Sequence, residues 1–370
     1  MFRVDIAHRL IALSSILCCS LAVLFPDPPS TCPCADPKLC EPITRKPERE
    51  VYAFSVSPKT WKHYDWSKLT TVVMFGYYDA ELMCFAHSQN VKVVFKGYIS
   101  VANLTDSYAR NLWVVEQLQT AVDGHFDGIN IDIEDPVVDK SVEKELLTEL
   151  VEQTSEAFHI MNKFSQVTFD VAWSPDCIDK RCYDYKGLAD ATDFLFVMSY
   201  DEQSQIYGPC VAMANSPYNK TVTGVEKYLK LGIPANKLVL GVPWYGYDYP
   251  CVNITKDNLC TIKKVPFRGA PCSDAAGRQK DYRVINEIIK NSTTGRLWND
   301  EYKAPYFNFE DPTTKQTHQM WYDDPESLKY RYDYASKTGL LGVGMWEADS
   351  LDYSDDETAK KQTKAMWDAL

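Results

Sequence analysis

The chain has 370 residues, of which 45% are apolar and 13% aromatic, so it is long and apolar enough to bury a large core. Its formal net charge of −12 argues against nucleic acid and anionic membrane surfaces as partners. The length allows either two domains or a single α/β barrel.

The first residues are typical of a secretory signal peptide. Arg3 stands ahead of an apolar run over residues 10–25, which Pro26 ends. The run has about 16 residues, fewer than the roughly 20 that a membrane-spanning helix requires, so a membrane-anchoring signal is the second choice. We expect cleavage between residues 29 and 35 and interpret 1–35 as signal peptide and junction, which leaves a mature protein without a membrane anchor.

The cysteines predict disulfides in an exported protein. Removing the two cysteines of the signal leaves ten of the 12, an even number. Cys177 and Cys182 are close enough to close a loop. A zinc site at Cys32 and Cys34 is the alternative, but no histidines stand at ligand spacing, so we expect no metal. Three more cysteines cluster locally: Cys251, Cys260 and Cys272.

Four Asn-x-Ser/Thr motifs agree with passage through a glycosylating compartment. We expect N-glycosylation at Asn103, Asn219, Asn253 and Asn291.

Strand and helix patterns alternate along the chain. Eight β-branched and aromatic runs predict strands over 51–56, 71–75, 91–95, 128–134, 167–173, 194–200, 239–245 and 342–346. Helical patterns lie over 108–122, 141–164, 222–231, 325–337 and 356–370. Alternation favours parallel pairing, and eight units close into a (β/α)8 TIM barrel, which we assign to 36–370 as a single domain. An open doubly wound sheet is the alternative, but no Gly-rich phosphate loop follows the first strand.

One connection is far longer than a normal loop between a strand and a helix. About a hundred residues separate the strand over 239–245 from the strand over 342–346. A hairpin is predicted within this connection, from 306–309 and 318–322. We interpret about 247–324 as a small insertion on the rim of the barrel.

The predicted strand over 128–134 has one apolar and one polar face. Three isoleucines alternate with Asn130, Asp132 and Glu134. Burial of unpaired carboxylates costs several kcal/mol each, so a central strand keeps such a row mainly for chemistry. Two carboxyls on one face raise the pKa of one partner, which suits a general acid. Calcium binding is the alternative, but these oxygens are too few, and we expect neither metal nor cofactor.

Later strands also end on side chains that suit a sugar. In an α/β barrel functional residues gather at the carboxyl ends of the strands. No histidine stands at a predicted strand end, so a Ser-His-Asp or Cys-His arrangement is not indicated. The candidate cleft residues at these ends are Met198, Tyr200, Asp201, Tyr245 and Trp346. Further candidates, for which plain packing is the alternative, are Trp173, Trp244, Tyr207 and Arg268.

These motifs together resemble the family 18 glycoside hydrolases, the chitinase-like α/β barrels. The matching positions are Asp127, Gly128, Asp132 and Glu134, then Met198, Tyr200 and Asp201, then Gly241, Pro243, Tyr245 and Gly246, and finally Trp346. The similarity covers roughly 48–370, and over 167–175, 198–205, 241–249 and 265–279 it points to a lysosomal member.

The resemblance implies a retaining mechanism in which the 2-acetamido group of the substrate is the nucleophile. Glu134 would protonate the leaving oxygen, Asp132 would orient the acetamido group, and Asp127 and Gly128 would be structural. The resemblance implies these substrate-binding residues: Asn130, Met198, Tyr200, Asp201, Tyr245 and Trp346.

The chain departs from the family pattern at two positions. The family usually has Asp where this chain has Asn130, which we expect to donate a fixed hydrogen bond to Asp132 and to change the pH optimum. A Ser-x-Gly-Gly element is expected after the third strand, where Lys96, Gly97 and Tyr98 stand instead.

The resemblance implies a lysosomal, monomeric glycosidase. Its oligosaccharide substrate would contain GlcNAcβ1-4GlcNAc, as in the chitobiose core of N-linked glycans. One alternative is a secreted chitinase that acts on longer oligomers. A second is an inactive lectin, but such proteins typically lose the acid at the position of Glu134, which is intact here.

Overall fold

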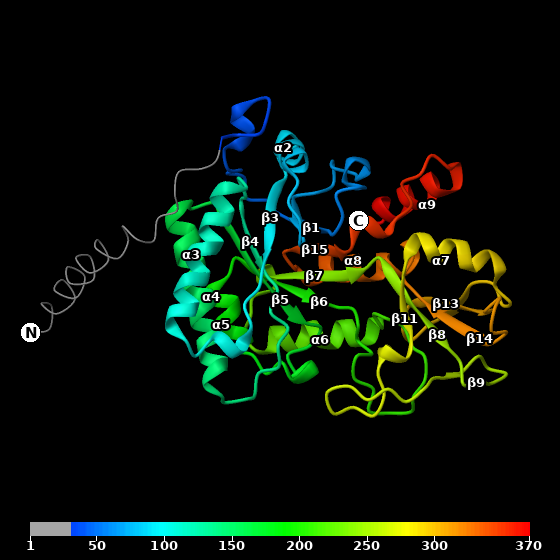
Figure 1. The fold of residues 1–370 in the computed structure, drawn as a ribbon. Coiled ribbons are helices and arrows are strands. Elements are labelled where there is room, and N and C mark those ends of the chain that lie inside the picture. Colours follow the sequence, from blue (N-terminus) through cyan, green and yellow to red (C-terminus); the bar gives the residue numbers. More distant parts are fainter. Residues whose placement is uncertain (1–30) are drawn as a thin grey trace, which may run out of the picture.

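Eight parallel strands form a closed barrel in the computed structural model, which describes residues 31–370 (Figure 1). The strands, in their order around the barrel, are β1 (Glu50–Ser55), β15 (Gly342–Trp346), β7 (Leu238–Pro243), β6 (Phe194–Met198), β5 (Gln166–Ala172), β4 (Gly128–Ile131), β3 (Lys92–Gly97) and β2 (Thr71–Met74). The predicted TIM barrel is therefore confirmed. Most of the predicted segment 1–35 lies outside the described residues.

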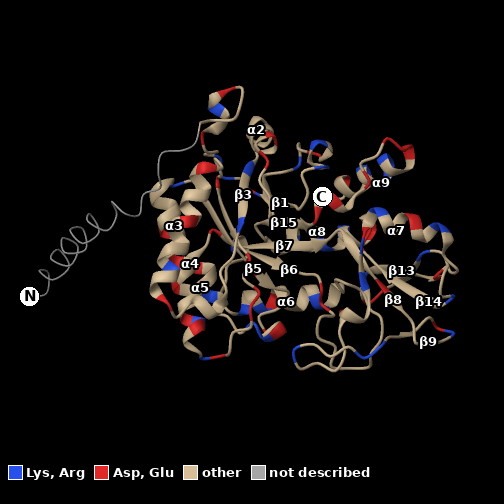
Figure 2. Cartoon of the chain, viewed as in Figure 1, with Lys and Arg blue, Asp and Glu red and all other residues tan. Residues whose placement is uncertain are grey.

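Helices surround the barrel and alternate with its strands (Figure 1). Aspartate side chains cap the amino ends of five of them, because a carboxylate accepts hydrogen bonds from otherwise unpaired N–H groups. The charged residues of both signs are scattered over the helices and loops at the surface (Figure 2). Within residues 31–370, every helix is too short or too polar to cross a membrane. The helices are α2 (Ala80–Ser88), α3 (Ser107–Asp123), α4 (Val142–Met161), α5 (Tyr185–Ala191), α6 (Tyr218–Lys230), α8 (Pro325–Thr338) and α9 (Glu357–Asp368).

Aromatic side chains fill the interior of the barrel. The ring centroids of Phe196 and Phe54 lie 4.9 Å apart, and those of Phe196 and Tyr52 lie 5.6 Å apart. Gly241 and Gly344 on the neighbouring strands make room for the Phe196 ring, since a Cβ atom at either position would lie within 2.6 Å of it. The barrel is a packed core, and polar groups buried within it bond to one another, as the hydroxyls of Tyr52 and Thr168 do at 3.0 Å.

The rim insertion is larger than the predicted hairpin. It contains a five-stranded antiparallel sheet, the rim sheet, which lies beside the barrel (Figure 1). The sequence indicated a strand over 239–245, but β7 ends at Pro243, and the N–H of Trp244 then donates to the carbonyl of Trp346 at 2.8 Å. The rim sheet consists, in spatial order, of β11 (Arg278–Asp281), β8 (Tyr245–Pro250), β14 (Thr317–Trp321), β13 (Ala304–Glu310) and β12 (Leu297–Asn299). The predicted hairpin is confirmed as β13 and β14. Beside the sheet lie α7 (Tyr282–Ile288) and the short pair β9 (Asn253–Ile254) and β10 (Cys260–Thr261).

All ten cysteines of the described residues form disulfides. The predicted bond between Cys177 and Cys182 is present. Cys32, Cys34 and Cys40, whose Sγ atoms all lie within 4.8 Å of one another, are used in disulfides and are not available as thiolate ligands. The other pairs are Cys32 with Cys40, Cys34 with Cys84, Cys210 with Cys272, and Cys251 with Cys260.

Asp127 fastens the segment before β1 to the base of the barrel, where the strands begin. Its carboxylate accepts hydrogen bonds from the N–H groups of Ile43 and Val93, both at 2.7 Å, and from Nε2 of His87 at 3.0 Å. Nδ1 of His87 lies 2.7 Å from the carbonyl of Leu39. Two acceptors on one imidazole require both nitrogens to carry protons. Burial lowers the pKa of His87, but the hydrogen bond and charge of Asp127 outweigh it and raise the pKa above its usual value.

Next to Asp127, Gly128 is required by a close approach. Its φ is +158°, and a Cβ atom at this position would lie 2.0 Å from the backbone oxygen of Gln166 on β5. The start of the functional strand is thus fixed by packing at its base.

We expect the stabilisation from His87 to depend on pH. Because its folded-state pKa is raised, the contribution is complete below the usual pKa of about 6.5 and is lost as the pH rises through the folded-state value. Urea unfolding at pH 5 is expected to show His87→Gln about 2 kcal/mol less stable than wild type, a difference that shrinks by pH 9. A difference that stayed constant with pH would contradict a charged His87.

Candidate active site

Asp132 and Glu134 follow β4 at the mouth of the barrel, where the strands end, and each forms an ion pair. The strand was predicted to continue to Glu134 but ends at Ile131; Asp132 still donates its N–H to the carbonyl of Gly97 at 2.9 Å, after which β3 offers no further partner. Oδ2 of Asp132 lies 2.9 Å from Nζ of Lys96, and Oε2 of Glu134 lies 2.6 Å from Nη1 of Arg181. The two acids are thus held by separate ion pairs.

Glu134 is the more accessible of the two acids. Its side chain is 53% exposed, whereas that of Asp132 is 9% exposed. Loss of hydration in the cleft raises the pKa of Glu134; Arg181 opposes this, and three neighbouring carboxylates reinforce it. A raised pKa increases the protonated fraction of Glu134 at mildly acidic pH, as a proton donor requires.

A cavity of about 210 Å³ opens in front of Glu134. Met198, Tyr200 and Asp201 line it, so the structure brings these three predicted residues together with the predicted acid. A neighbouring cavity of about 560 Å³ shares Trp173 with it. The remaining lining residues of the smaller cavity are Asp179, Arg181, Ser204, Tyr247, Phe267, Asp274 and Ala275.

Asp201 is held rigidly by its neighbours. Its backbone lies in the left-handed region, with φ of 50°, and its N–H donates to Oδ1 of Asn215 at 2.7 Å. The hydroxyls of Tyr245 and Tyr247 both donate to its carboxylate, the latter at 3.0 Å. Burial nevertheless raises the pKa of Asp201, against these two hydrogen bonds. Tyr245 does not line the cavity, so in this structure it acts on Asp201 from behind.

Trp346 lies beside the Lys96 ion pair. Its ring packs edge-on against Phe75, with centroids 4.8 Å apart, and lies 5.2 Å from Phe54. Nζ of Lys96 lies 4.2 Å from the centre of the Phe75 ring. Trp346 is partly exposed, and it contacts the Phe75 ring over which the cation of the Asp132 ion pair lies.

Asn130 does not make the predicted contact. It is fully buried, and its amide donates to Oδ1 of Asp170 at 2.7 Å and to the hydroxyl of Thr168 at 3.0 Å, both on β5. The expected bond to Asp132 was wrong because β4 and β5 pair Asn130 with Thr168, which brings Asp170 next to Asp132. Asn130 lies beneath the cavity and does not line it.

Asp170 was missed in the sequence. Its exposed fraction is 2%, and burial together with the Asp132 carboxylate raises its pKa well above the usual range. The only available signal was a single acid within an apolar strand.

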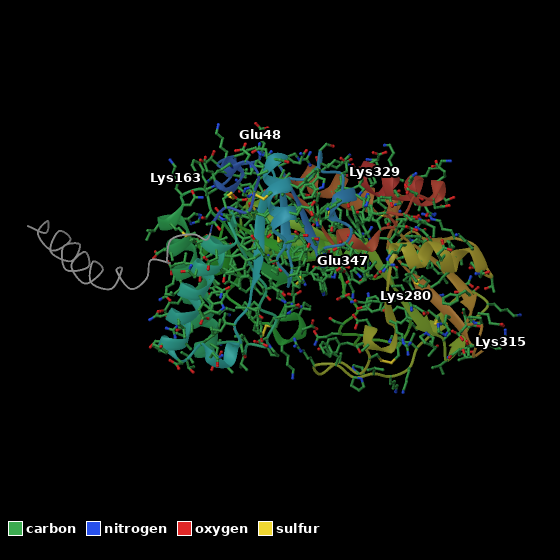
Figure 3. The ribbon with its side chains drawn as sticks, turned by 45° about the horizontal axis from the view of Figure 1, so that its top comes forward. Glu48, Lys163, Lys280, Lys315, Lys329 and Glu347 are labelled. Carbon is green, nitrogen blue, oxygen red and sulfur yellow. A yellow bond between two sulfur atoms is a disulfide. The ribbon has the colours of Figure 1, made fainter. Side chains whose placement is uncertain are left out.

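Further ionisable groups near the site were missed as well. Burial raises the pKa of Asp274 to about 7, with help from Asp201. Burial likewise raises the pKa of Glu347, next to Trp346, to about 8. Figure 3 labels Glu347 where the barrel meets the rim sheet. Asp274 begins a short 3-10 helix in the rim insertion, and Glu347 directly follows β15; no sequence pattern marks either acid as buried.

The other candidate cleft residues fall into different places. Trp173 lines both cavities, and Tyr207 is 70% exposed beside the larger one. Nη1 of Arg268 donates to the carbonyl of Asp179 at 2.8 Å. Trp244 is fully buried against Trp367, so the expectation that it lines the cleft was wrong. The four predicted glycosylation sites are all exposed: Asn103, Asn219, Asn253 and Asn291.

A (β/α)8 barrel with carboxylates and aromatic rings at its mouth has the architecture of a glycoside hydrolase. The profile of Glycosyl hydrolases family 18 matches residues 51–350, and the chain belongs to this family. It is therefore a glycoside hydrolase, an enzyme that acts on oligosaccharides.

Curated relatives of this chain are called di-N-acetylchitobiase. The chain is 56% identical over 339 residues to the protein of that name from Mus musculus, with 92% of each chain covered. The identity to the protein of the same name from Homo sapiens is 54% over 339 residues, with 92% of this chain and 88% of the relative covered.

Solved structures share the fold at low sequence identity. A family 18 N-acetylglucosaminidase from Paenibacillus barengoltzii superposes with a TM-score of 0.68 at 19% identity, covering 87% of this chain and 100% of the other. A family 18 chitinase from Cycas revoluta in complex with (GlcNAc)3 gives 0.64 at 18% identity, covering 86% and 99%.

We expect Asp170→Asn to become more stable relative to wild type as the pH rises. Because the pKa of Asp170 is raised, the folded wild type keeps a proton above pH 4 that the unfolded chain has released, so wild type loses stability with increasing pH. The asparagine variant lacks this loss, and the difference between them is expected to grow by up to about 1.4 kcal/mol per pH unit. The measurement is urea unfolding between pH 5 and 7.

The double exchange Asn130→Asp with Asp170→Asn is the matched control. It keeps one carboxyl and one amide in contact between β4 and β5, so it is expected to show the pH dependence of wild type. Equal slopes for Asp170→Asn and wild type would mean that Asp170 is ionised in the folded protein.

Proposed function

We propose that this enzyme hydrolyses the β1-4 bond between two GlcNAc residues in small soluble oligosaccharides. Its physiological substrate would be the chitobiose core of N-linked glycans, during lysosomal degradation of glycoproteins. The observation that carries this proposal is Glu134, half exposed beside a cavity that Tyr200 and Asp201 also line. The name shared by the mouse and human relatives supports the substrate.

The proposed mechanism retains the anomeric configuration. The acetamido oxygen of the substrate attacks the anomeric carbon while Glu134 gives its proton to the leaving oxygen, which yields an oxazolinium ion and the released sugar. Glu134, now a carboxylate, takes a proton from water as the water oxygen attacks the anomeric carbon and opens the ring. These two steps regenerate the acetamido group and the protonated Glu134.

Asp132 is proposed to orient the acetamido N–H and to stabilise the positive charge of the oxazolinium ion. Its ion pair with Lys96 fixes the direction of the carboxylate. Tyr200 and Asp201 would hold the acetamido group, and Trp346 would form an apolar surface under the sugar ring. Positioning of this kind supplies much of the rate gain in an intramolecular attack.

The disulfides and the exposed glycosylation motifs support entry into the secretory pathway. Delivery to the lysosome is part of the proposal, and its acidic interior suits a carboxylic acid as proton donor. Secretion is the alternative.

A direct test compares Glu134 with the other acid of the cavity. Burial raises the pKa of Asp274 to about 7, which makes it the alternative proton donor, but the carboxylates that act on it are Asp201 and Asp179. We expect Glu134→Gln to lose at least about 10²-fold in kcat, because it can neither donate nor accept the proton, whereas Asp274→Asn stays within about tenfold. Rates on a chromogenic GlcNAc glycoside give both values. The reverse order would assign the acid to Asp274.

Substrate class and mechanism are tested with a panel of saccharides. Chitobiose, longer chito-oligomers and a peptide-free core glycan are expected to release GlcNAc from the reducing end. On the retaining route, the newly formed reducing end of the other product is expected to show its β-anomer NMR signal first. A chitobiose analogue with a free amine in place of the reacting acetamido group is expected to resist hydrolysis. Internal cleavage of polymeric chitin alone would favour a chitinase, and rapid hydrolysis of the amine analogue would contradict substrate assistance.

A further inference from the structure

Arg181 is a buried cation in direct contact with the proposed acid. It lies in the loop between β5 and α5, within the ring closed by the disulfide of Cys177 and Cys182. Its side chain is 7% exposed; Nη1 lies 2.6 Å from Oε2 of Glu134, and Nη2 lies 3.1 Å from Oδ2 of Asp179. A guanidinium stays charged in proteins, so these two carboxylates balance a permanent buried charge.

Neighbouring elements hold this loop in place. The hydroxyl of Ser204 donates to Oδ1 of Asp179 at 2.9 Å, and the N–H of Asp179 donates to Oε1 of Gln205 at 2.9 Å. The hydroxyl of Tyr185 donates to the carbonyl of Arg181. With the backbone anchored on both sides, Arg181 is presented to Glu134 in a fixed geometry.

The position of Arg181 is unexpected for a general acid. An acid must carry its proton before the reaction, and an adjacent guanidinium favours the ionised carboxylate. The effect of the guanidinium on Glu134 is opposed by carboxylates from three other elements and from the loop that carries Arg181. Apart from Arg181, the charged and titratable groups around Glu134 are Asp132, Asp170, Asp179, Asp201, Tyr183, Tyr200 and Arg268. Of these, Arg268 reaches only the backbone carbonyl of Glu134, at 3.4 Å.

We propose that Arg181 is a positioning residue that sets the pH range in which Glu134 acts as general acid, with Asp179 moderating it by occupying half of the guanidinium fork. This inference rests on the proposed role of Glu134. Arg181 stabilises the carboxylate formed after proton donation, and it confines the protonated form to more acidic pH. As a result, a smaller fraction of Glu134 is protonated, and thus active, at neutral pH.

The proposal predicts opposite shifts for two substitutions in one loop. Arg181→Gln removes the cation, so the alkaline limb of kcat/KM is expected to move up by about one pH unit. Asp179→Asn removes a carboxylate and leaves the guanidinium to Glu134 alone, so the limb is expected to move down. Asparagine tolerates the positive φ of 54° at this position. Arg181→Lys keeps the charge, and its limb is expected to stay near that of wild type.

A merely structural role gives a different result. Loss of loop order would lower kcat in all three variants without moving the limb in opposite directions. Circular dichroism and thermal unfolding identify variants that do not fold, and Asp179→Asn, nearly identical in shape to the native residue, remains informative if Arg181→Gln is unstable. Unmoved or equal limbs in folded Arg181→Gln and Asp179→Asn would overturn the proposal.

The titration of Glu134 is also measured without any substrate. Carbon-13 NMR of carboxyl-labelled glutamate, assigned with Glu134→Gln, follows the group directly in each variant. If wild type cleaves no GlcNAc glycoside, the proposed function fails while the titration of Glu134 still tests the effect of Arg181. If wild type is active but Glu134 titrates identically in all variants, only the role of Arg181 fails.

Discussion

Charge balance at the mouth of the barrel is the constraint on which the site depends. Lys96 at 2.9 Å and Arg181 at 2.6 Å meet the two carboxylates that follow β4. Desolvation of an ion costs several kcal/mol, so each acid needs a partner of fixed position. The cations come from β3 and from the loop after β5, which flank β4 in the closed barrel. The ion pairs of the site can therefore form only when β3, β4 and β5 are paired in the closed barrel.

The rim sheet is part of the same arrangement. Its first strand, β8, begins two residues after β7 ends and carries Tyr245 and Tyr247 toward Asp201. Two hydroxyls on one carboxylate restrict its orientation, that of Tyr245 from behind the cavity and that of Tyr247 from the cavity wall. The insertion thus supports the site from behind, in addition to forming part of the cavity wall through Asp274.

The sequence predicted the strands well because alternation and apolar runs report burial directly. The strand predicted over 342–346 coincides with β15, and the alternation around Asp132 located the functional strand. The partner of Asn130 was not predictable, since it depends on the register between β4 and β5. Arg181 was missed because it stands in an irregular loop, where only the spacing of the flanking cysteines indicated order. Tertiary neighbours, and not local patterns, decide the electrostatics of the site.

The segment around Cys34 has a consequence for attaching probes to the protein. Its disulfide to Cys84 on α2 and the bond between Ile43 and Asp127 keep it at the base of the barrel, far from the rim sheet (Figure 1). A fluorophore or affinity tag joined just ahead of Cys32 would therefore lie at the base of the barrel, on the face opposite the cleft. Immobilisation through that end would orient the cleft toward solution and leave it open to large glycans.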